Sequence, residues 1–343
     1  MAVATPGTLG TSNNAAYANT NFLRVFSGEV LTAFERMVSM KPHVKIRSIS
    51  QGSSAKFPSM GRTIAAYHVP GTELTGDRIA LADKIINVDG LLLASTFWDD
   101  LEEVMNHFDV RSESSNQLGE ALAIQYDRDR VADLALAADV TIPRITSETE
   151  MVGTIVGDGV TTLSTGKALA KGLVISQAAL AGAVTEANGN TVVQLIFSLA
   201  EIMSENHIPK SGRALLITPH IFNLLMNSTK AINRDWNPDG NGSIKEGTVF
   251  RVAGFELIEN TSALGQNLTG LTTTYNGTAH GKDLTNYGII AFHKSATGVV
   301  QLKGLTSEME YDIRRQGTLM VSKFALGGDF LRPEAVIAVA PGA

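Results

Sequence analysis

The hydrophobic pattern between residues 48 and 95 predicts two extended strands that form a polar hairpin. The outgoing stretch alternates polar and apolar positions as a β-strand does, but its apolar side chains are few, namely Ala55, Phe57 and Met60. Residues 83–95 predict the returning strand, and Pro70-Gly71 is a turn signal between the two. Pro58 predicts an edge strand, because proline cannot donate a ladder hydrogen bond. A two-stranded ribbon is marginal alone in water, so we expect it to rest on another surface.

Helical spacing of apolar positions predicts three helices in the first 140 residues. The first occupies residues 21–40, with an interruption at Gly28 and an end at Pro42. A short helix is predicted near 98–106 and a long one over about 111–138, which at 1.5 Å per residue spans roughly 40 Å. The apolar residues of the long helix are small and sparse, and the charged run YDRDR lies among them. We therefore expect a strut across a sheet, with one face left for solvent or a neighbour.

Helices and strands alternate between residues 190 and 300. An amphipathic helix over 190–209 precedes a strand-then-helix unit in 213–228, with Thr218 as N-cap and Pro219 at the first helical position. Further strands are predicted in GTVFRVAGFELIEN, in YGIIAFHKSATGVVQL and in the tail near 305–325 and 334–340. This pattern predicts an α/β unit with a core of its own.

Length and composition narrow the class of protein. A chain of 343 residues predicts two or more subdomains, and 44% hydrophobic with 18% charged residues is ordinary for a globular protein. No apolar run approaches the roughly 18 to 20 residues of a membrane helix. The stretch MAVATPGTLGTSNNAAYANTN predicts a flexible arm and no secretory signal. The absence of cysteine excludes disulfides and thiolate chemistry, and a net charge of −6 disfavours tight general binding of nucleic acid.

One stretch matches a metal-binding pattern in form. The calcium-loop pattern D-x-[DN]-x-[DN]-G-x5-E is satisfied by Asp235, Asn237, Asp239, Gly240 and Glu246. Gly242 occupies a position where such loops usually place an aliphatic residue, Pro238 lies inside the loop, and a predicted strand replaces the exit helix. We expect an ordinary polar surface loop and keep calcium binding as an alternative.

The search for catalytic constellations finds none. The seven histidines form no H-x3-H or H-E-x-x-H pair, and lone histidines such as His107 and His293 favour a structural role. The paired carboxylates Asp99-Asp100 and Glu102-Glu103 suit the first turn of a helix. No Walker loop, G-x-S-x-G or G-x-G-x-x-G is present. We expect no enzymatic activity and no cofactor. An arm, a ribbon and a polar strut instead indicate a protein that contacts other chains.

Several blocks, in order along the chain, resemble the major capsid protein of T-seven-like short-tailed bacteriophages. They are FSGEVLTAFER (26–36), VKIRSISQGSSAKFPSMGRTIAAYHVPG (44–71), KIINVDGLLLAS (84–95), MNHFDVRSESSNQLGEALA (105–123), VAGFE (252–256), FHKSATGVVQLK (292–303) and LRPEAV (331–336). The resemblance implies an α+β chain with the Hong Kong 97-like capsid fold.

The resemblance also implies a domain layout. Residues 1–45 correspond to the N-terminal arm and 46–84 to the E-loop, the hairpin that lies over the adjacent subunit. Residues 85–139 and 299–325 correspond to the peripheral domain, with its spine helix at about 111–138. Residues 140–298 and 326–343 correspond to the axial domain. On this interpretation the ribbon rests on the next subunit.

Function and partners follow from the same resemblance. It implies a coat protein that self-assembles as pentamers and hexamers into the icosahedral head around phage double-stranded DNA. The implied partners are further copies of this chain, a scaffolding protein, a portal protein and packaged DNA in weak non-specific contact, with no membrane. The implied location is the virion, assembled in the cytoplasm of a bacterial host.

We expect the contact residues between subunits to lie on the ribbon and the strut. Phe57 and Met60 are predicted apolar anchors, while Lys56 and Arg62 are predicted partners for acidic groups of a neighbour. Charged contacts along the strut are predicted at Asp127, Arg128, Asp129 and Arg130. Two alternatives stay open: an encapsulin-like shell that encloses cargo, and a calcium-binding soluble protein.

Overall fold

The fold is described from a computed structural model. The structure describes residues 15–60, 67–71, 73, 81–99, 105, 110–139, 173–177, 180–228, 242–243, 248–249, 251–270 and 280–341. The chain divides into two compact units. Unit 1 comprises Met1–Val38, Leu91–Tyr126 and Lys303–Leu326, and unit 2 comprises Ser39–Gly90, Asp127–Leu302 and Gly327–Ala343.

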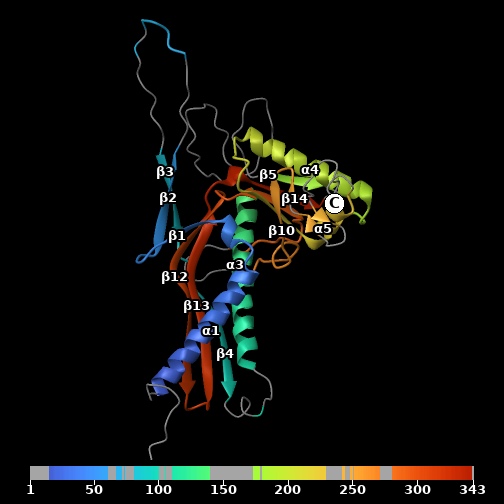
Figure 1. Ribbon diagram of the computed structural model, residues 1–343. Coiled ribbons are helices and arrows are strands. Elements are labelled where there is room, and N and C mark those ends of the chain that lie inside the picture. Colours follow the sequence, from blue (N-terminus) through green and yellow to red (C-terminus); the bar gives the residue numbers. More distant parts are fainter. Residues whose placement is uncertain are drawn as a thin grey trace, which may run out of the picture. The chain divides into compact units, whose positions relative to one another are not determined.

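Unit 1 is built from helices and long strands. Helix α1 (Ala15–Met37) lies obliquely to the first part of helix α3 (Val110–Asp139) in Figure 1. In the sheet, strand β4 (Gly90–Asp99) neighbours β13 (Gly317–Phe330), which neighbours β12 (Thr297–Asp312). Strand β4 alternates half-buried and exposed residues along its length, as expected for a strand with one covered face.

The two helices of unit 1 approach closely because α3 has a glycine at the contact. A Cβ at Gly119 would lie 2.6 Å from the carbonyl oxygen of Val30 and 2.8 Å from the Cβ of Ala33. The core of this unit joins helices and sheet through Phe26, Val30, Leu118 and Met320, with Ala94, Trp98, Leu305 and Met309 packed against them.

The larger sheet of unit 2 has six strands in the described part of the chain, in the order β5-β14-β11-β6-β10-β9. Their bounds are β5 Leu173–Gln177, β6 Arg213–Ile217, β9 Arg251–Val252, β10 Phe255–Glu259, β11 Ile289–His293 and β14 Val336–Pro341. All five residues of β6 are buried, so this central strand is covered on both faces. Short strands β7 (Gly242–Ser243) and β8 (Thr248–Val249) pair separately.

Two helices of unit 2 pack tightly on each other. Helix α4 (Glu186–Glu205) has Thr185 as its N-cap, and the Thr185 side chain accepts a hydrogen bond from the Asn188 amide. Helix α5 (Pro219–Met226) has Thr218 as N-cap, without a side-chain cap bond, and proline in its first turn. A Cβ at Gly189 would lie 2.4 Å from the Leu224 carbonyl oxygen, which shows how close the helices come.

The remaining elements of unit 2 are two 3-10 turns, strand β1 and a two-stranded hairpin. A 3-10 turn (Lys41–His43) leads into β1 (Lys45–Ser48), which pairs in parallel with the start of β12. Strands β2 (Ser54–Met60) and β3 (Leu81–Asn87) form a two-stranded antiparallel hairpin, drawn as a separate ribbon in Figure 1. A short 3-10 turn (Pro333–Ala335) precedes β14.

The long helix, the 213–228 unit and the C-terminal strands confirm the sequence predictions, with three differences. Helix α1 begins at Ala15, inside the stretch expected to be a flexible arm, and continues through Gly28 without interruption. The single strand predicted over 83–95 is two strands, broken between β3 and β4. The helix predicted near 98–106 starts too early, because residues 98 and 99 end β4; residues 100–104 lie outside the described part.

No helix among the described residues is long and apolar enough to cross a membrane.

Candidate assembly site at the β2–β3 hairpin

The β2–β3 hairpin has two different faces near its base. Its register runs from Ser54 opposite Asn87 to Met60 opposite Leu81, so neighbouring residue pairs alternate between the faces. One face carries Ala55 and Ile86, both buried. The opposite face carries the exposed pair Lys56 and Ile85, and the Ile85 side chain is 49% exposed.

The base of the hairpin packs on its own subunit. A small apolar cluster comprises Ala55, Phe57, Ile86, Val88 and Val300, with Ile49, Leu302 and Leu331 against it. Phe57 is only 5% exposed, and the cationic groups of Lys45 and Arg47 lie 6.0 and 5.9 Å from the centroid of its ring. Although the apolar residues of the ribbon are few, those at its base therefore belong to the core of their own subunit.

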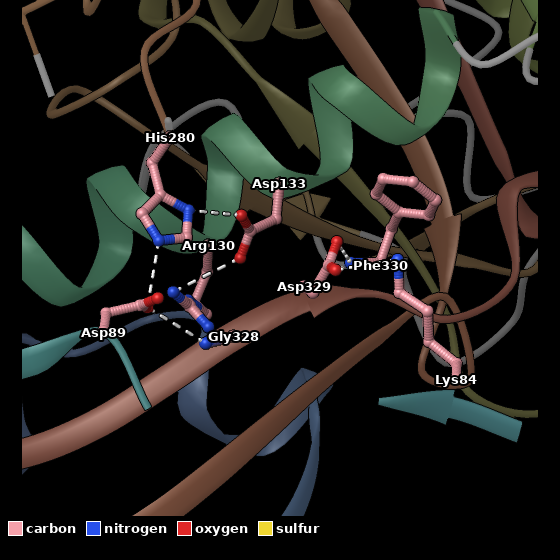
Figure 2. Close-up of polar contacts among 8 residues, drawn as sticks. All are labelled: Lys84, Asp89, Arg130, Asp133, His280, Gly328, Asp329 and Phe330. Atoms are coloured by element: carbon pink, nitrogen blue, oxygen red, sulfur yellow. Dashed lines mark hydrogen bonds and ion pairs between the residues drawn. The ribbon is translucent and has the colours of Figure 1, made fainter. Parts of the chain in front are cut away.

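An ion pair ties the same face of the hairpin to the end of β13. Lys84 Nζ lies 2.8 Å from Asp329 Oδ2 and 4.3 Å from the centroid of the Phe330 ring, an arrangement that Figure 2 shows. Burial raises the pKa of Asp329, and the hydrogen bond from Lys84 opposes that rise. The pair lies partly out of water, where screening by salt is weaker than on the surface.

Four charged residues meet where the hairpin ends, and we call them the buried ion cluster: Asp89, Arg130, Asp133 and His280 (Figure 2). His280 Nδ1 lies 2.6 Å from Asp133 Oδ1, and His280 Nε2 lies 2.9 Å from Asp89 Oδ2. Arg130 Nη2 lies 3.2 Å from Asp133 Oδ2. The side chains of Arg130 and His280 are 0% and 1% exposed.

The cluster favours the charged form of its histidine. Burial alone would lower the pKa of His280, but the bonds to Asp133 and Asp89 raise the pKa to about 10. Arg130 acts in the opposite direction by repulsion between cations. With His280 protonated, the cluster holds two cations and two anions, which is the condition for burying such groups.

The far end of the hairpin differs from its base. The described residues there, 67–71 and Glu73, are exposed, and they include the apolar side chains of Tyr67 and Val69. Apolar side chains at a loop end contribute nothing to the core of their own subunit. Exposed apolar groups of this kind mark contact sites for other molecules when they meet a complementary surface.

A second exposed apolar surface lies on unit 1. On the outer face of its sheet, Leu91, Leu93 and Phe97 of β4 are exposed, and so is Leu319 of the neighbouring strand β13. We call these four residues the outer sheet patch. A Cβ at Gly317 would lie 2.5 Å from the Phe97 ring, so that ring lies directly on β13. The opposite face of the same sheet carries Met320 and Trp98 of the core.

The structure places the eight predicted contact residues in different surroundings. Lys56 is exposed, and Phe57 is buried in its own subunit. Arg62 and the side chain of Met60 lie outside the described residues. Arg128 and Asp129 are half-buried, and Arg128 donates through Nε to the Ser262 carbonyl at 2.9 Å. Asp127 and Arg130 are buried at 4% and 0% exposure, where we expected accessible charges. A contact role for all eight remains a prediction.

Asp127 holds the turn that follows α1. Its carboxylate accepts hydrogen bonds from the Ser39 amide at 2.9 Å, the Ser39 hydroxyl at 2.7 Å and the Met40 amide at 3.1 Å. Burial raises the pKa of Asp127, and these three bonds oppose the rise. The charge thus serves the backbone of its own subunit.

Replacing Asp127 with alanine should lower the free energy of unfolding by about 2 kcal/mol, because the buried amide of Met40 and the half-buried amide of Ser39 lose their acceptor. Asp127→Asn keeps one acceptor oxygen and should lose less. Urea unfolding followed by circular dichroism measures both. Equal losses in the two variants would contradict a role based on hydrogen bonding.

Three residues of the buried ion cluster escaped the sequence analysis: Asp89, Asp133 and His280. One local signal existed, since Arg130 and Asp133 are three residues apart and are flanked by Val131, Ala132, Leu134 and Ala135. Charges inside such a run indicate partners from elsewhere in the chain. His280, the partner of Asp133, is 147 residues away in sequence, and Asp89 is 191 residues from His280, so spacing cannot identify them.

The structure offers no metal centre within the described ranges, where no group of three or more His, Cys, Asp or Glu is arranged to hold an ion. The calcium-loop pattern at 235–246 lies largely outside those ranges.

Comparison with known proteins gives consistent matches. Residues 56–340 match the model of the family described as "Gp10A-like: Major capsid protein". The chain is 34% identical over 346 residues to the major capsid protein of Enterobacteria phage T3, covering 96% of this chain and 94% of that protein. It is 31% identical over 335 residues to the major capsid protein of Escherichia phage T7, covering 93% and 91%.

Solved structures show the same similarity. The capsid structure of Cyanophage P-SCSP1u matches with a TM-score of 0.68 and 32% identity, covering 87% of this chain and 86% of that one. The mature capsid of bacteriophage PhiM1 matches with a TM-score of 0.65 at 19% identity, a level that supports the fold alone.

Proposed function

Because the chain belongs to the Gp10A-like family of major capsid proteins and has the Hong Kong 97-like capsid fold, we propose that it assembles as pentamers and hexamers into the icosahedral head around phage double-stranded DNA. The family match and the identities to phage coat proteins favour this function over an encapsulin-like compartment. No enzymatic activity is proposed.

The observation that carries the proposal is the contrast between the two ends of the hairpin. The base is fixed to its own subunit by an apolar cluster and an ion pair. The far end presents Tyr67 and Val69 to solvent. A hairpin anchored at one end and apolar at the other is suited to contact a second copy of the chain.

The outer sheet patch is the surface we propose for that contact. It is apolar and exposed, and it belongs to a different part of the chain from the hairpin. Two different surfaces of identical subunits form a heterologous contact, which repeats around a ring when the rotation closes. Pentamers and hexamers are rings of this kind.

Further partners are proposed from the family alone. They are a scaffolding protein, a portal protein and packaged DNA, with the virion as the location and the host cytoplasm as the place of assembly. The net charge of −6 is consistent with weak contact between coat and DNA.

We also propose a domain layout. Residues 1–45 act as the arm and 46–84 as the E-loop. Residues 85–139 with 299–325 act as the peripheral domain, and residues 140–298 with 326–343 act as the axial domain.

The test is assembly of a variant with Tyr67→Asp and Val69→Asp. Both side chains are exposed, so we expect the subunit to fold with an unchanged circular dichroism spectrum but to form no shells in electron micrographs. Tyr67→Phe with Val69→Ile keeps the apolar surface and should assemble. Normal shells from the aspartate variant would overturn the proposed hairpin contact.

A further inference from the structure

The direction of the β2–β3 hairpin depends on contacts at its base. The hairpin belongs to a two-stranded sheet of its own among the described strands, so no neighbouring strand orients it. The apolar cluster under Phe57 holds the base down, but apolar contacts have little directional preference. Hydrogen bonds do have one, since they weaken steeply away from linearity.

The buried ion cluster supplies directional bonds at the point where the hairpin ends. Asp89 follows β3 by two residues, and its Oδ2 atom accepts from the Gly328 amide at 3.2 Å besides the bond with His280. Asp89 is thus tied to the backbone of β13 and, through His280, to Asp133 on α3. Figure 2 shows the bonds of Asp89 with Gly328 and His280 and the bond of His280 with Asp133.

Close backbone packing reinforces this position. A Cβ at Gly327 would lie 2.0 Å from the Asn87 carbonyl oxygen, and a Cβ at Gly328 would lie 1.1 Å from Arg130 Nη1. The base of the hairpin and the guanidinium group of Arg130 therefore occupy the space that side chains at positions 327 and 328 of β13 would fill. A change in hairpin direction has to disturb this packing.

We propose that the buried ion cluster is a latch that fixes the direction of the β2–β3 hairpin and that holds only while His280 is protonated. The proposal rests on the proposed function, because the far end of the hairpin, with Tyr67 and Val69, is what meets a second copy of the chain. It adds that residues within one subunit, those of the buried ion cluster, set the direction in which the hairpin reaches that second copy.

The chemistry of imidazole explains why the charge is needed. Protonated His280 donates from both ring nitrogens and so binds Asp133 and Asp89 at once. A neutral ring has one N–H and can donate to one carboxylate, so the other is left buried without this donor. Loss of the proton also leaves two anions against one cation in the cluster.

Polar and charged groups of β13, of α3 and of the residues after β3 surround His280 and its partners, and some of them favour or oppose protonation of His280. Asp89, after β3, and Asp133, on α3, stabilise the imidazolium, while Arg130 on α3 opposes it. From β13 come the Gly328 amide, which donates to Asp89, and Asp329, which is paired with Lys84. The two carboxylates in direct contact dominate and raise the pKa of His280 to about 10.

The latch can be tested by measuring hairpin direction in the full chain. The protein has no cysteine, so Asp83→Cys on β3 and Ser198→Cys on α4, both exposed, give two unique sites for spin labels. Pulsed electron resonance then reports the distribution of distances between them. In the labelled parent we expect a narrow distribution. Asp89→Ala should broaden it at least about twofold, because the hairpin samples several directions.

A matched control breaks a different anchor of the same hairpin. Lys84→Met removes the ion pair with Asp329 but leaves the buried ion cluster intact, and it should broaden the distribution less than Asp89→Ala does. An unchanged distribution in Asp89→Ala, or equal broadening in Lys84→Met, would overturn the proposal. If Asp89→Ala fails to fold, the parent is measured from about pH 7 to about pH 11, where the distribution should broaden reversibly as His280 loses its proton. A constant width over that range would also overturn it.

The same labels separate this proposal from the proposed function. The variant with Tyr67→Asp and Val69→Asp has an intact latch and should keep the narrow distribution while failing to assemble. Assembly of that variant would reject the hairpin contact, whereas the distance measurement would still decide the latch.

Discussion

Replacing Gly327 with alanine should strongly destabilise the folded subunit. A Cβ at this position would lie 2.0 Å from the Asn87 carbonyl oxygen and 2.7 Å from the Val88 Cα, which are both backbone atoms at the end of the hairpin. Backbone cannot move aside as a side-chain terminus can, so β13 and the hairpin base must separate. Such overpacking of a closed site, with loss of the neighbouring bonds, should lower the free energy of unfolding by about 3 kcal/mol or more.

Gly270→Ala is the matched control for this prediction. Among the described residues, no heavy atom lies within 4 Å of the place a Cβ at Gly270 would take, and Gly270 lies outside the left-handed region, so its replacement should change the free energy of unfolding by less than about 0.5 kcal/mol. Urea unfolding of both variants at neutral pH measures the difference. Equal stability of the two variants would mean that β13 and the hairpin base are not in contact in solution.

The elements that could be predicted from sequence are those with a strong local pattern. Helix α3 was predicted over about 111–138 and spans Val110–Asp139, because the stretch is free of proline and dominated by helix formers after its first turn. The β6–α5 unit was placed by Thr218 and Pro219, which act within one turn of the helix. The Hong Kong 97-like fold was predicted through the family resemblance, and the solved capsid structures confirm it.

The break between β3 and β4 could not be predicted, although the site depends on it. The sequence DKIINVDGLLLAS reads as one apolar strand, and its turn signal, Asp89 followed by Gly90, is short. The structure turns the chain there, with Gly90 at a φ of 135°, and directs Asp89 to His280 and Gly328. The reason for the break is a set of partners distant in sequence, which periodicity does not encode.

The charges on α3 show the same limit. The run YDRDR suggested an accessible polar face, yet Asp127 caps the backbone at Ser39 and Arg130 pairs with Asp133 inside the subunit. Half-buried Arg128 and Asp129 lie between them. Whether a charged residue faces solvent or a buried partner depends on what packs against each turn of the helix, and that is a tertiary property.

The stability of the subunit should fall as the pH rises above neutrality, and His280 is the cause. Its pKa is 6.5 in a model peptide and about 10 in the folded chain, so between these values the folded state binds one proton more than the unfolded state. The stabilisation is complete below about pH 6.5 and is lost as the pH approaches 10. Over this window the free energy of unfolding should decrease by about 1.4 kcal/mol per pH unit.

Other titrating groups act outside this window, which makes the measurement specific. Burial lowers the pKa of His43 and His293, so their effect on stability lies below pH 6.5, where it has the opposite sign. Free tyrosine ionises near pH 10, so chemical unfolding is best measured between about pH 7 and 9.5.

The control variant is His280→Gln. It should be less stable than the parent at pH 7, and its free energy of unfolding should not change with pH across this range. A flat profile in the parent would mean that His280 is neutral in the folded subunit, and the four buried charges would then need a different proton arrangement.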